Sequence, residues 1–381
     1  MIDSCTYHDL MRKVLKLISV NILVLVMAVL FLNASVILFY QAVQIVSPPG
    51  TLDKRAELPN YNGLDWADIH FKEFNSIPTE YRSYIGWRRL PYQGKTVTIN
   101  HQGIRETPQS PLAKDDALLV SFLGGSTMWG TGAPDHQTIP AYFSMNAKGK
   151  YRTQNLAETG YNAFQGFLFL KLQIINGLRP DLVIAYDGVN EQPTLYPENR
   201  LFSHHRENQI RDRMKGADQG QVPSLQEFFI KPLQVVTTKI AERLRLLSEA
   251  PPQSITTERI NQTARILLES WLATKQLAEQ NGADFLAILQ PNAHLGHPRL
   301  DHLELQQDNK KYDFYPVVMQ LLKEPRYQEL NDKVVDVTNV FDVDEMVYVD
   351  FCHVSPNGNR LVAERIYQLV ISKYNAISQV H

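Results

Sequence analysis

Three side chains of this sequence, Ser126, Asp350 and His353, could together carry out nucleophilic catalysis. Ser126 directly follows Gly124 and Gly125, and two glycines let the backbone turn sharply where an apolar run ends. Gly-Gly-Ser alone is also ordinary turn composition. A serine becomes a strong nucleophile only when an oriented base takes its proton. Asp350 and His353 precede a predicted helix and could supply that base and its carboxylate from one short loop.

Two further loops offer groups that could stabilise a negatively charged intermediate. Gly160 can present a bare backbone N–H, and Asn190, which follows Gly188, offers a side-chain amide. The oxyanion formed when a serine attacks an ester needs such preorganised donors, each worth about a hundred- to a thousand-fold in rate. The sequence therefore contains candidates for every part of a serine-esterase site.

In this order the four blocks resemble those of the SGNH/GDSL hydrolase superfamily, over roughly residues 116 to 375. The resemblance implies that Ser126 attacks the ester, that His353 acts as general base and then general acid, and that Asp350 orients His353. It also implies an oxyanion hole made by the backbone N–H groups of Ser126 and Gly160 and the amide of Asn190. The first block reads Gly-Gly-Ser where many members have Gly-Asp-Ser. Gly-Gly-Ser occurs in several carbohydrate-esterase-like branches, and the chain resembles these. The α/β-hydrolase elbow is excluded, because its second glycine would stand at Met128.

The elements that must position these residues alternate between strands and helices, which predicts a mostly parallel sheet. The resemblance implies a three-layer α/β/α, flavodoxin-like SGNH fold. We expect strands at 117–123, 152–156, 181–186, 285–289 and 334–337. We expect helices at 138–148, 163–177, 258–281 and 357–373, with another near 233–247.

Four segments describe the predicted organisation of the chain. They are a cytoplasmic N-terminus (1–16), a transmembrane signal anchor (17–46), a linker and appendage (47–115) and a hydrolase domain (116–377) with insertions at about 192–255 and 293–330. Only residues 95–100 of the appendage alternate like a strand. Its aromatic and basic side chains could line a substrate approach or could simply pack and be solvated: Tyr81, Tyr84, Trp87, Arg88, Arg89, His101 and Arg105.

The predicted anchor carries no charge from Leu17 to Val46. About 20 apolar residues suffice to cross a bilayer as a helix. Arg12, Lys13 and Lys16 precede this run, which by the positive-inside rule keeps the N-terminus cytoplasmic and the catalytic part periplasmic or extracellular. A cleaved signal peptide is the alternative, but the apolar run is longer than such a peptide needs.

Composition and spacing exclude several other classes. With 38 Lys and Arg against 40 Asp and Glu, the formal net charge of −2 argues against a nucleic-acid binder. Cys5 and Cys352 lie on opposite sides of the predicted span, so a disulfide between them is implausible. A metal site formed by His294, His297, His302 and Asp301 is disfavoured because these residues lack the helical spacing of zinc hydrolases. We expect neither a metal nor a cofactor.

Other chemically interesting residues have simpler structural interpretations. Asp187 and Glu191 flank the Asn190 block and could be acid and base, but loop carboxylates are more often structural. Trp129 could form the floor of an acyl or sugar pocket, or it could pack the first helix. Cys352, between the two catalytic candidates, is most simply a small buried residue.

These observations predict a membrane-anchored serine esterase that removes small acyl groups, such as acetyl, from an extracytoplasmic carbohydrate. An O-acyltransferase with the same triad, acting on an envelope or secreted polysaccharide, is the first alternative. A non-catalytic glycan-binding or scaffold protein is the second. The expected partners are an ester substrate, the membrane, and an envelope or polysaccharide-synthesis complex.

Overall fold

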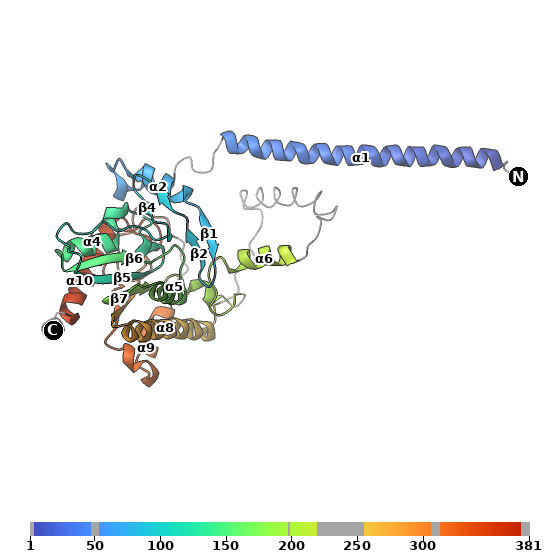
Figure 1. Ribbon diagram of the computed structural model, residues 1–381. Helices are drawn as coiled ribbons and strands as arrows, with labels where there is room; N and C mark the ends of the chain where they lie inside the picture. The colour runs from blue at the N-terminus through green and yellow to red at the C-terminus, as the bar shows by residue number, and fades with distance from the viewer. Residues whose placement is uncertain (1–3, 47–52, 197–198, 219–254, 306–312, 375–381) are drawn as a thin grey trace. The chain divides into compact units, whose positions relative to one another are not determined.

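The computed structural model describes residues 4–46, 53–196, 199–218, 255–305 and 313–374 (Figure 1). The chain divides into two compact units, one of residues 1–51 and 209–252 and the other of residues 52–208 and 253–381. The helix expected near 233–247 lies outside the described residues. All the candidate site residues fall in the second unit.

A five-stranded parallel sheet forms the centre of the second unit. Its strands are β5 (Leu118–Gly124), β6 (Tyr151–Asn155), β7 (Leu182–Asp187), β8 (Asp284–Leu289) and β9 (Val334–Asp336). They lie in the order β6-β5-β7-β8-β9 with every pair parallel. From β5 the chain adds β6 on one side of the sheet, and it then adds β7, β8 and β9 on the other side, so the strand order switches between β5 and β7. In doubly wound sheets ligands bind at such a switch point, beyond the carboxyl ends of the strands.

Helices cover both faces of this sheet (Figure 1). Every residue of β7 is buried, and successive side chains enter opposite cores, Val183 one and Ile184 the other. The first core is completed by α5 (Ala163–Ile175), α8 (Thr257–Gln280) and α9 (Phe314–Leu321), and the second by α4 (Ile139–Asn146) and α10 (Pro356–Tyr374). Two-sided burial explains the continuous apolar strands. The predicted three-layer α/β fold is confirmed.

Residues 313–330, expected within an insertion, contain helical structure that belongs to the core. In α9, Phe314, Val318 and Leu321 are buried, a spacing that puts them on one face of the helix. This face packs against α8, and a short 3-10 helix, Pro325–Leu330, follows. The segment therefore extends the apolar layer over the sheet.

The segment before the sheet is more regular than its sequence indicates. It contains α2 (Ala67–Ser76), the hairpin β1 (Thr79–Arg82) and β2 (Gly86–Arg89), and the pair β3 (Tyr92–Gln93) and β4 (Thr98–Ile99). Short 3-10 helices span Lys54–Glu57 and Pro59–Tyr61. Trp87 and Ile104 join one core of the sheet and Val97 joins the other. Of these strands, only β4 lies in the range predicted to alternate.

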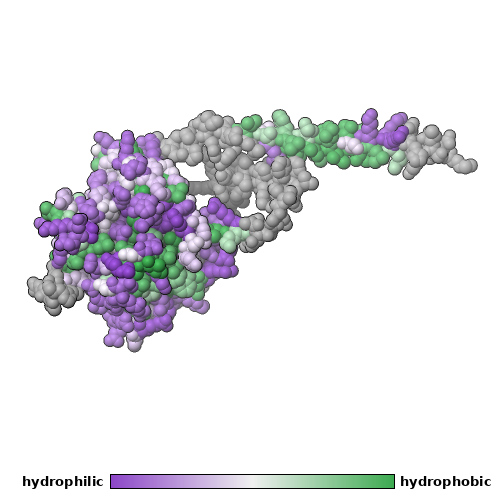
Figure 2. All heavy atoms as spheres, in the orientation of Figure 1, coloured by the Kyte–Doolittle hydropathy of each residue, from purple (hydrophilic) through white to green (hydrophobic). Residues whose placement is uncertain are grey.

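The first unit contains α1 (Ser4–Val46). Within it, Met11–Ser35 is a 25-residue stretch of mean hydropathy 2.6, long and apolar enough to cross a membrane. Figure 2 shows hydrophobic residues along the described part of this helix. Helix α6 (Glu207–Asp218) begins at the end of the second unit and continues into the first.

Candidate active site

The candidate nucleophile stands at a sharp strand-to-helix turn. β5 ends at Gly124, whose φ of +150° is unfavourable for residues with a side chain, and Ser126 begins the short helix α3 (Ser126–Trp129). A Cβ on Gly125 would lie 2.0 Å from the Asn190 side-chain nitrogen, so any other residue there would displace the Asn190 amide. The turn leaves the half-buried Ser126 at the carboxyl edge of the sheet, beside β7.

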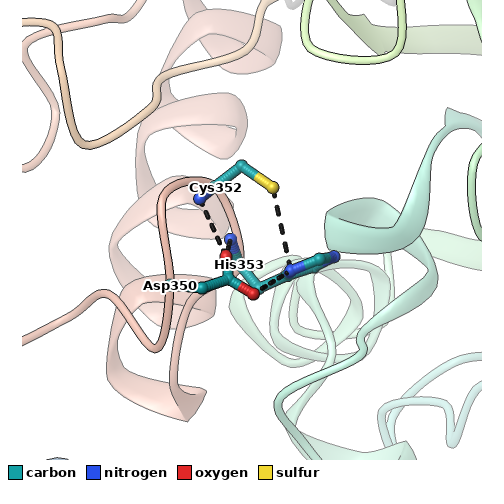
Figure 3. Close-up of side chains that lie close together, drawn as sticks. All are labelled: Asp350, Cys352 and His353. Carbon is teal, nitrogen blue, oxygen red and sulfur yellow. Dashed lines mark hydrogen bonds and ion pairs between the residues drawn. The ribbon is translucent and has the colours of Figure 1, made fainter. Parts of the chain in front are cut away.

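Ser126, His353 and Asp350 form one hydrogen-bonded chain. The Ser126 Oγ lies 2.6 Å from Nε2 of His353, and Nδ1 of His353 lies 2.6 Å from Oδ2 of Asp350. The other oxygen of Asp350 accepts the backbone N–H groups of Cys352 and His353 at 2.9 and 2.8 Å. Figure 3 shows the Asp350 carboxylate directed at the His353 ring.

The state of Asp350 determines which nitrogen of His353 can act as a base. Burial opposes the charged form of Asp350, but the facing His353 and the hydrogen bonds outweigh it and hold the pKa of Asp350 well below its usual range. An ionised carboxylate only accepts hydrogen bonds, so Nδ1 of His353 carries a proton. In the neutral ring Nε2 is then free to accept the proton of Ser126, which is the arrangement general-base catalysis needs.

A second buried chain of hydrogen bonds holds the His353 loop against the nucleophile helix. The Thr127 hydroxyl donates to the carbonyl of Cys352 at 3.1 Å, and the Gln290 amide donates to that hydroxyl at 2.9 Å. Both side chains are almost fully buried. Sequence reasoning missed them, because the only signal was their position at the ends of β5 and β8.

The loops that carry the predicted oxyanion donors Gly160 and Asn190 reach the same turn. Asn190 packs against Gly125, and its side-chain amide donates to the carbonyl of Tyr161 at 2.8 Å. Gly160, with φ +78°, precedes Tyr161 in the loop after β6. A Cβ on Gly125 would lie 3.2 Å from the Tyr161 carbonyl oxygen, so the two loops and the nucleophile turn meet at one place.

The buried arginines support the packing interpretation of the N-terminal segment. Arg88 donates to the carbonyls of Leu156, Ala157 and Gly103. Arg105 donates to three carbonyls of residues 129–133 and pairs with Asp135 at 2.8 Å. Arg89 and Arg105 lie over the fully buried ring of Trp129, at 4.5 and 4.3 Å from it. Trp129 therefore packs helix α3 into the core and does not form a pocket floor.

The remaining candidates from this segment divide between core and surface. Trp87 is buried and donates to the carbonyl of Thr159. Tyr81 and Tyr84 are 68% and 81% exposed, and His101 is also exposed. Tyr81 and His101 line a cavity of about 550 Å³ between the β1–β2 hairpin and α5, which Arg88 also borders.

The residues considered and disfavoured as metal ligands make separate contacts. His302 lies 2.8 Å from the carbonyl of Tyr348, the backbone of His297 donates to Asp342, and Asp301 pairs with Arg299. Among the described residues, the group with metal-ligand spacing is instead Asp350, Cys352 and His353, whose ligand atoms lie within 4.8 Å of one another. Asp350 and His353 are at hydrogen-bond distance and His353 also contacts Ser126, so the group fits a triad.

Comparisons with known proteins return structures only. No protein-family model and no curated protein matches the chain. Solved structures similar to it include the acetyl xylan esterase AlAXEase, with TM-score 0.38 and 14% identity, covering 67% of this chain and 100% of that one. A lipolytic G-D-S-L family member from Veillonella parvula has TM-score 0.36 and 10% identity, covering 68% and 99%. A carbohydrate acetylesterase family member from Sinorhizobium meliloti has TM-score 0.35 and 13% identity, covering 67% and 98%.

Proposed function

We propose that the protein is an SGNH-type serine esterase. The observation that carries this proposal is the hydrogen-bonded chain from Ser126 through His353 to Asp350, in which Nε2 of His353 lies 2.6 Å from the Ser126 Oγ. These are the distances over which a base can take the proton of a nucleophile. Ser126 follows β5, at the switch point between β5 and β7, and in doubly wound sheets ligands bind beyond the strand ends at such a point.

The reaction follows from the direction of these hydrogen bonds. As the Ser126 Oγ bonds to the ester carbonyl carbon, its proton passes to Nε2 of His353, and Asp350 stabilises the resulting imidazolium. The N–H groups of Ser126 and Gly160 and the Asn190 amide stabilise the oxyanion. His353 then protonates the departing alcohol as the acyl–oxygen bond breaks. Water attacks the acyl-serine by the same route and releases the carboxylic acid.

The substrate we propose is a small acyl ester, such as acetate, on an extracytoplasmic carbohydrate. Its support is the apolar helix Met11–Ser35, with Arg12, Lys13 and Lys16 near its start. In a membrane this distribution would keep the N-terminus in the cytoplasm and the catalytic unit outside. Envelope and secreted polysaccharides carry acyl esters on that side, and an envelope complex could deliver them.

The enzyme proposal is tested with the full chain in detergent micelles and 4-nitrophenyl acetate as substrate. The wild type is expected to release nitrophenolate, and Ser126→Ala to lose at least about a thousand-fold of that rate, because the proposed acyl-enzyme forms on the Ser126 Oγ. Ser76→Ala removes an exposed hydroxyl and is the matched control. A wild type that neither hydrolyses the ester nor reacts with a fluorophosphonate would contradict the proposal.

The carbohydrate part needs a separate measurement. The wild type is incubated with an acetylated polysaccharide, and free acetate is followed over time together with the mass of the sugar fragments. Release of acetate that depends on Ser126 supports a carbohydrate esterase. Acetylated sugar formed from an added oligosaccharide and an activated acetate ester, without matching release of acetate, would show acyl transfer instead.

A further inference from the structure

We infer that Glu191 is a positioning residue of the oxyanion hole, because its carboxylate joins the two loops that carry Gly160 and Asn190. This inference rests on the proposed esterase function. It assigns no contact with substrate to Glu191. It states that the two loops, and therefore two of the three proposed oxyanion donors, depend on this one side chain for their spacing.

The two oxygens of Glu191 contact different loops. Oε1 accepts the backbone N–H of Ala163 at 2.8 Å, and Oε2 accepts the backbone N–H of Gly188 at 2.9 Å. Ala163 lies three residues after Gly160, and Gly188 lies two residues before Asn190. A second link between the same loops runs from the Asn190 amide to the Tyr161 carbonyl at 2.8 Å. The carboxylate and the amide thus fix the separation of the two loops from both sides.

The surroundings of Glu191 make this bridge difficult to replace. The side chain is 2% exposed, so no bulk water can satisfy the two N–H groups if the carboxylate leaves. Ala163 is the first residue of α5, where the positive end of the helix dipole favours a negative charge. Gly188, with φ +134°, adopts a backbone conformation that favours glycine and presents its N–H to Glu191.

A neighbouring carboxyl, Asp187, lets Glu191 keep its charge. Asp187 is also buried and accepts the indole N–H of Trp271 at 2.9 Å. Burial and the nearby Glu191 raise the pKa of Asp187 to about 8, so Asp187 is protonated at neutral pH. Burial raises the pKa of Glu191 as well, but its two backbone N–H bonds favour the charged form. The pair therefore holds its proton on Asp187 and leaves both oxygens of Glu191 free to accept.

The first test is Glu191→Gln in the full chain, assayed with 4-nitrophenyl acetate. A glutamine has one acceptor oxygen, and its NH₂ would face the second backbone N–H. We expect kcat to fall about 10- to 100-fold, less than complete loss of a donor, while KM changes by less than about three-fold. The rate of inactivation by a fluorophosphonate should fall with kcat, because that adduct also places an oxygen in the oxyanion hole. Glu329→Gln, at a 60% exposed carboxylate, is the control.

Ala163→Pro removes one donor of the bridge and leaves Glu191 intact. Proline is well tolerated at the first position of a helix, and the extended backbone of Asn162 (φ −89°, ψ 173°) suits a residue before proline. This variant keeps the test decisive if Glu191→Gln does not fold, which tryptophan fluorescence would reveal. We expect a kcat loss of about three- to ten-fold, again with little change in KM.

The double variant Glu191→Gln/Asn190→Ala separates positioning from general packing. If Glu191 acts through Asn190, most of its effect disappears once the amide is gone, so the two losses are strongly non-additive. Folded single variants that keep kcat within two-fold, or a double variant whose losses multiply, would overturn the inference. A wild type without esterase activity would instead refute the proposed function.

Discussion

At the scale of single residues, the hydrogen bonds of Asp350 select the tautomer of His353. One carboxylate oxygen is occupied by two backbone N–H groups, which fixes the side chain, and the other accepts from Nδ1 of His353. The two backbone N–H bonds need only an acceptor oxygen at Oδ1, so they would survive loss of the carboxylate charge. The bond from Nδ1 of His353 depends on an acceptor at Oδ2. The two contributions can therefore be separated by one conservative substitution.

Asp350→Asn is expected to lower kcat roughly a thousand-fold at neutral pH. The asparagine oxygen can still accept the backbone N–H groups, but its NH₂ would face Nδ1 of His353. The neutral ring would then carry its proton on Nε2, where it can no longer take the proton of Ser126. Steady-state hydrolysis of 4-nitrophenyl acetate measures the loss. Asp344→Asn, at a 95% exposed carboxylate in the same segment, should leave the rate unchanged. Equal activity of the two variants would contradict the assigned tautomer.

The sequence identified the candidate triad because each member carries a local signal. Ser126 follows a glycine turn at a strand end, and Asp350 and His353 share one loop before a helix. Thr127, Gln290 and the bridging contacts of Glu191 have no such signal. The hydrogen bond from Gln290 to Thr127 joins residues 163 positions apart, so only the folded chain reveals it. The catalytic roles of the triad and of the oxyanion donors remain predictions.

At the scale of elements, the long periodic segments were predictable and the short ones were not. The sheet strands and α8 (Thr257–Gln280) lie within a few residues of their expected bounds. For β5, β7, β8 and α8 the reason is that each buries a continuous or periodic apolar pattern. The hairpin β1–β2 was not predicted, because neither strand alternates between buried and exposed residues. The residues of β1 are half-exposed or exposed, and those of β2 are mostly buried. Its buried arginines bind backbone carbonyls of other loops, a partnership that side-chain periodicity cannot indicate.

Helix α3 and the His353 loop are held together by the Thr127 hydroxyl, which predicts a distinctive pair of variants. Thr127→Val keeps the shape of the side chain but leaves the Cys352 carbonyl and the Gln290 amide without this partner. An unsatisfied buried polar group costs about 1–3 kcal/mol of stability. We expect Thr127→Val to lower the free energy of unfolding by that amount and kcat about ten-fold. Thr127→Ser keeps the hydroxyl and should retain most of both. Denaturant unfolding and ester hydrolysis check the pair, and equal effects in the two variants would contradict this role.

At the scale of the whole molecule, the buried His70 makes the stability of the second unit depend on pH. Its Nε2 donates to the carbonyl of Thr131 at 2.9 Å, and its Nδ1 lies 3.1 Å from the Thr96 hydroxyl. His70 is fully buried on α2 and links the N-terminal segment to the turn after α3. Burial, together with the charge of Arg105, lowers the pKa of His70 from 6.5 to about 3. The folded chain therefore keeps this ring neutral where the unfolded chain protonates it.

The sign of the pH effect follows from that depressed pKa. The stability that neutral His70 contributes is fully present above pH 6.5 and is lost as the pH falls from 6.5 toward 3. For one proton the slope is at most about 1.4 kcal/mol per pH unit. Between pH 6.5 and 5 ordinary carboxyl groups stay ionised, but Asp187, whose folded pKa is raised to about 8, contributes a slope of opposite sign. The contribution of His70 is therefore the difference in slope between the wild type and a His70 variant. His204 and His205, whose pKa values are also lowered by burial, add to the same slope.

His70→Gln should make the free energy of unfolding less dependent on pH between 6.5 and 5. A glutamine amide can still donate to the Thr131 carbonyl, and it does not titrate. All four tryptophans of the chain lie in the second unit. Their fluorescence during denaturant unfolding of the full chain in micelles therefore reports on this unit. His101→Gln, at an exposed position, is the matched control and should keep the wild-type slope. A His70→Gln variant with the same slope as the wild type would show that His70 is protonated as readily in the folded chain as in the unfolded one.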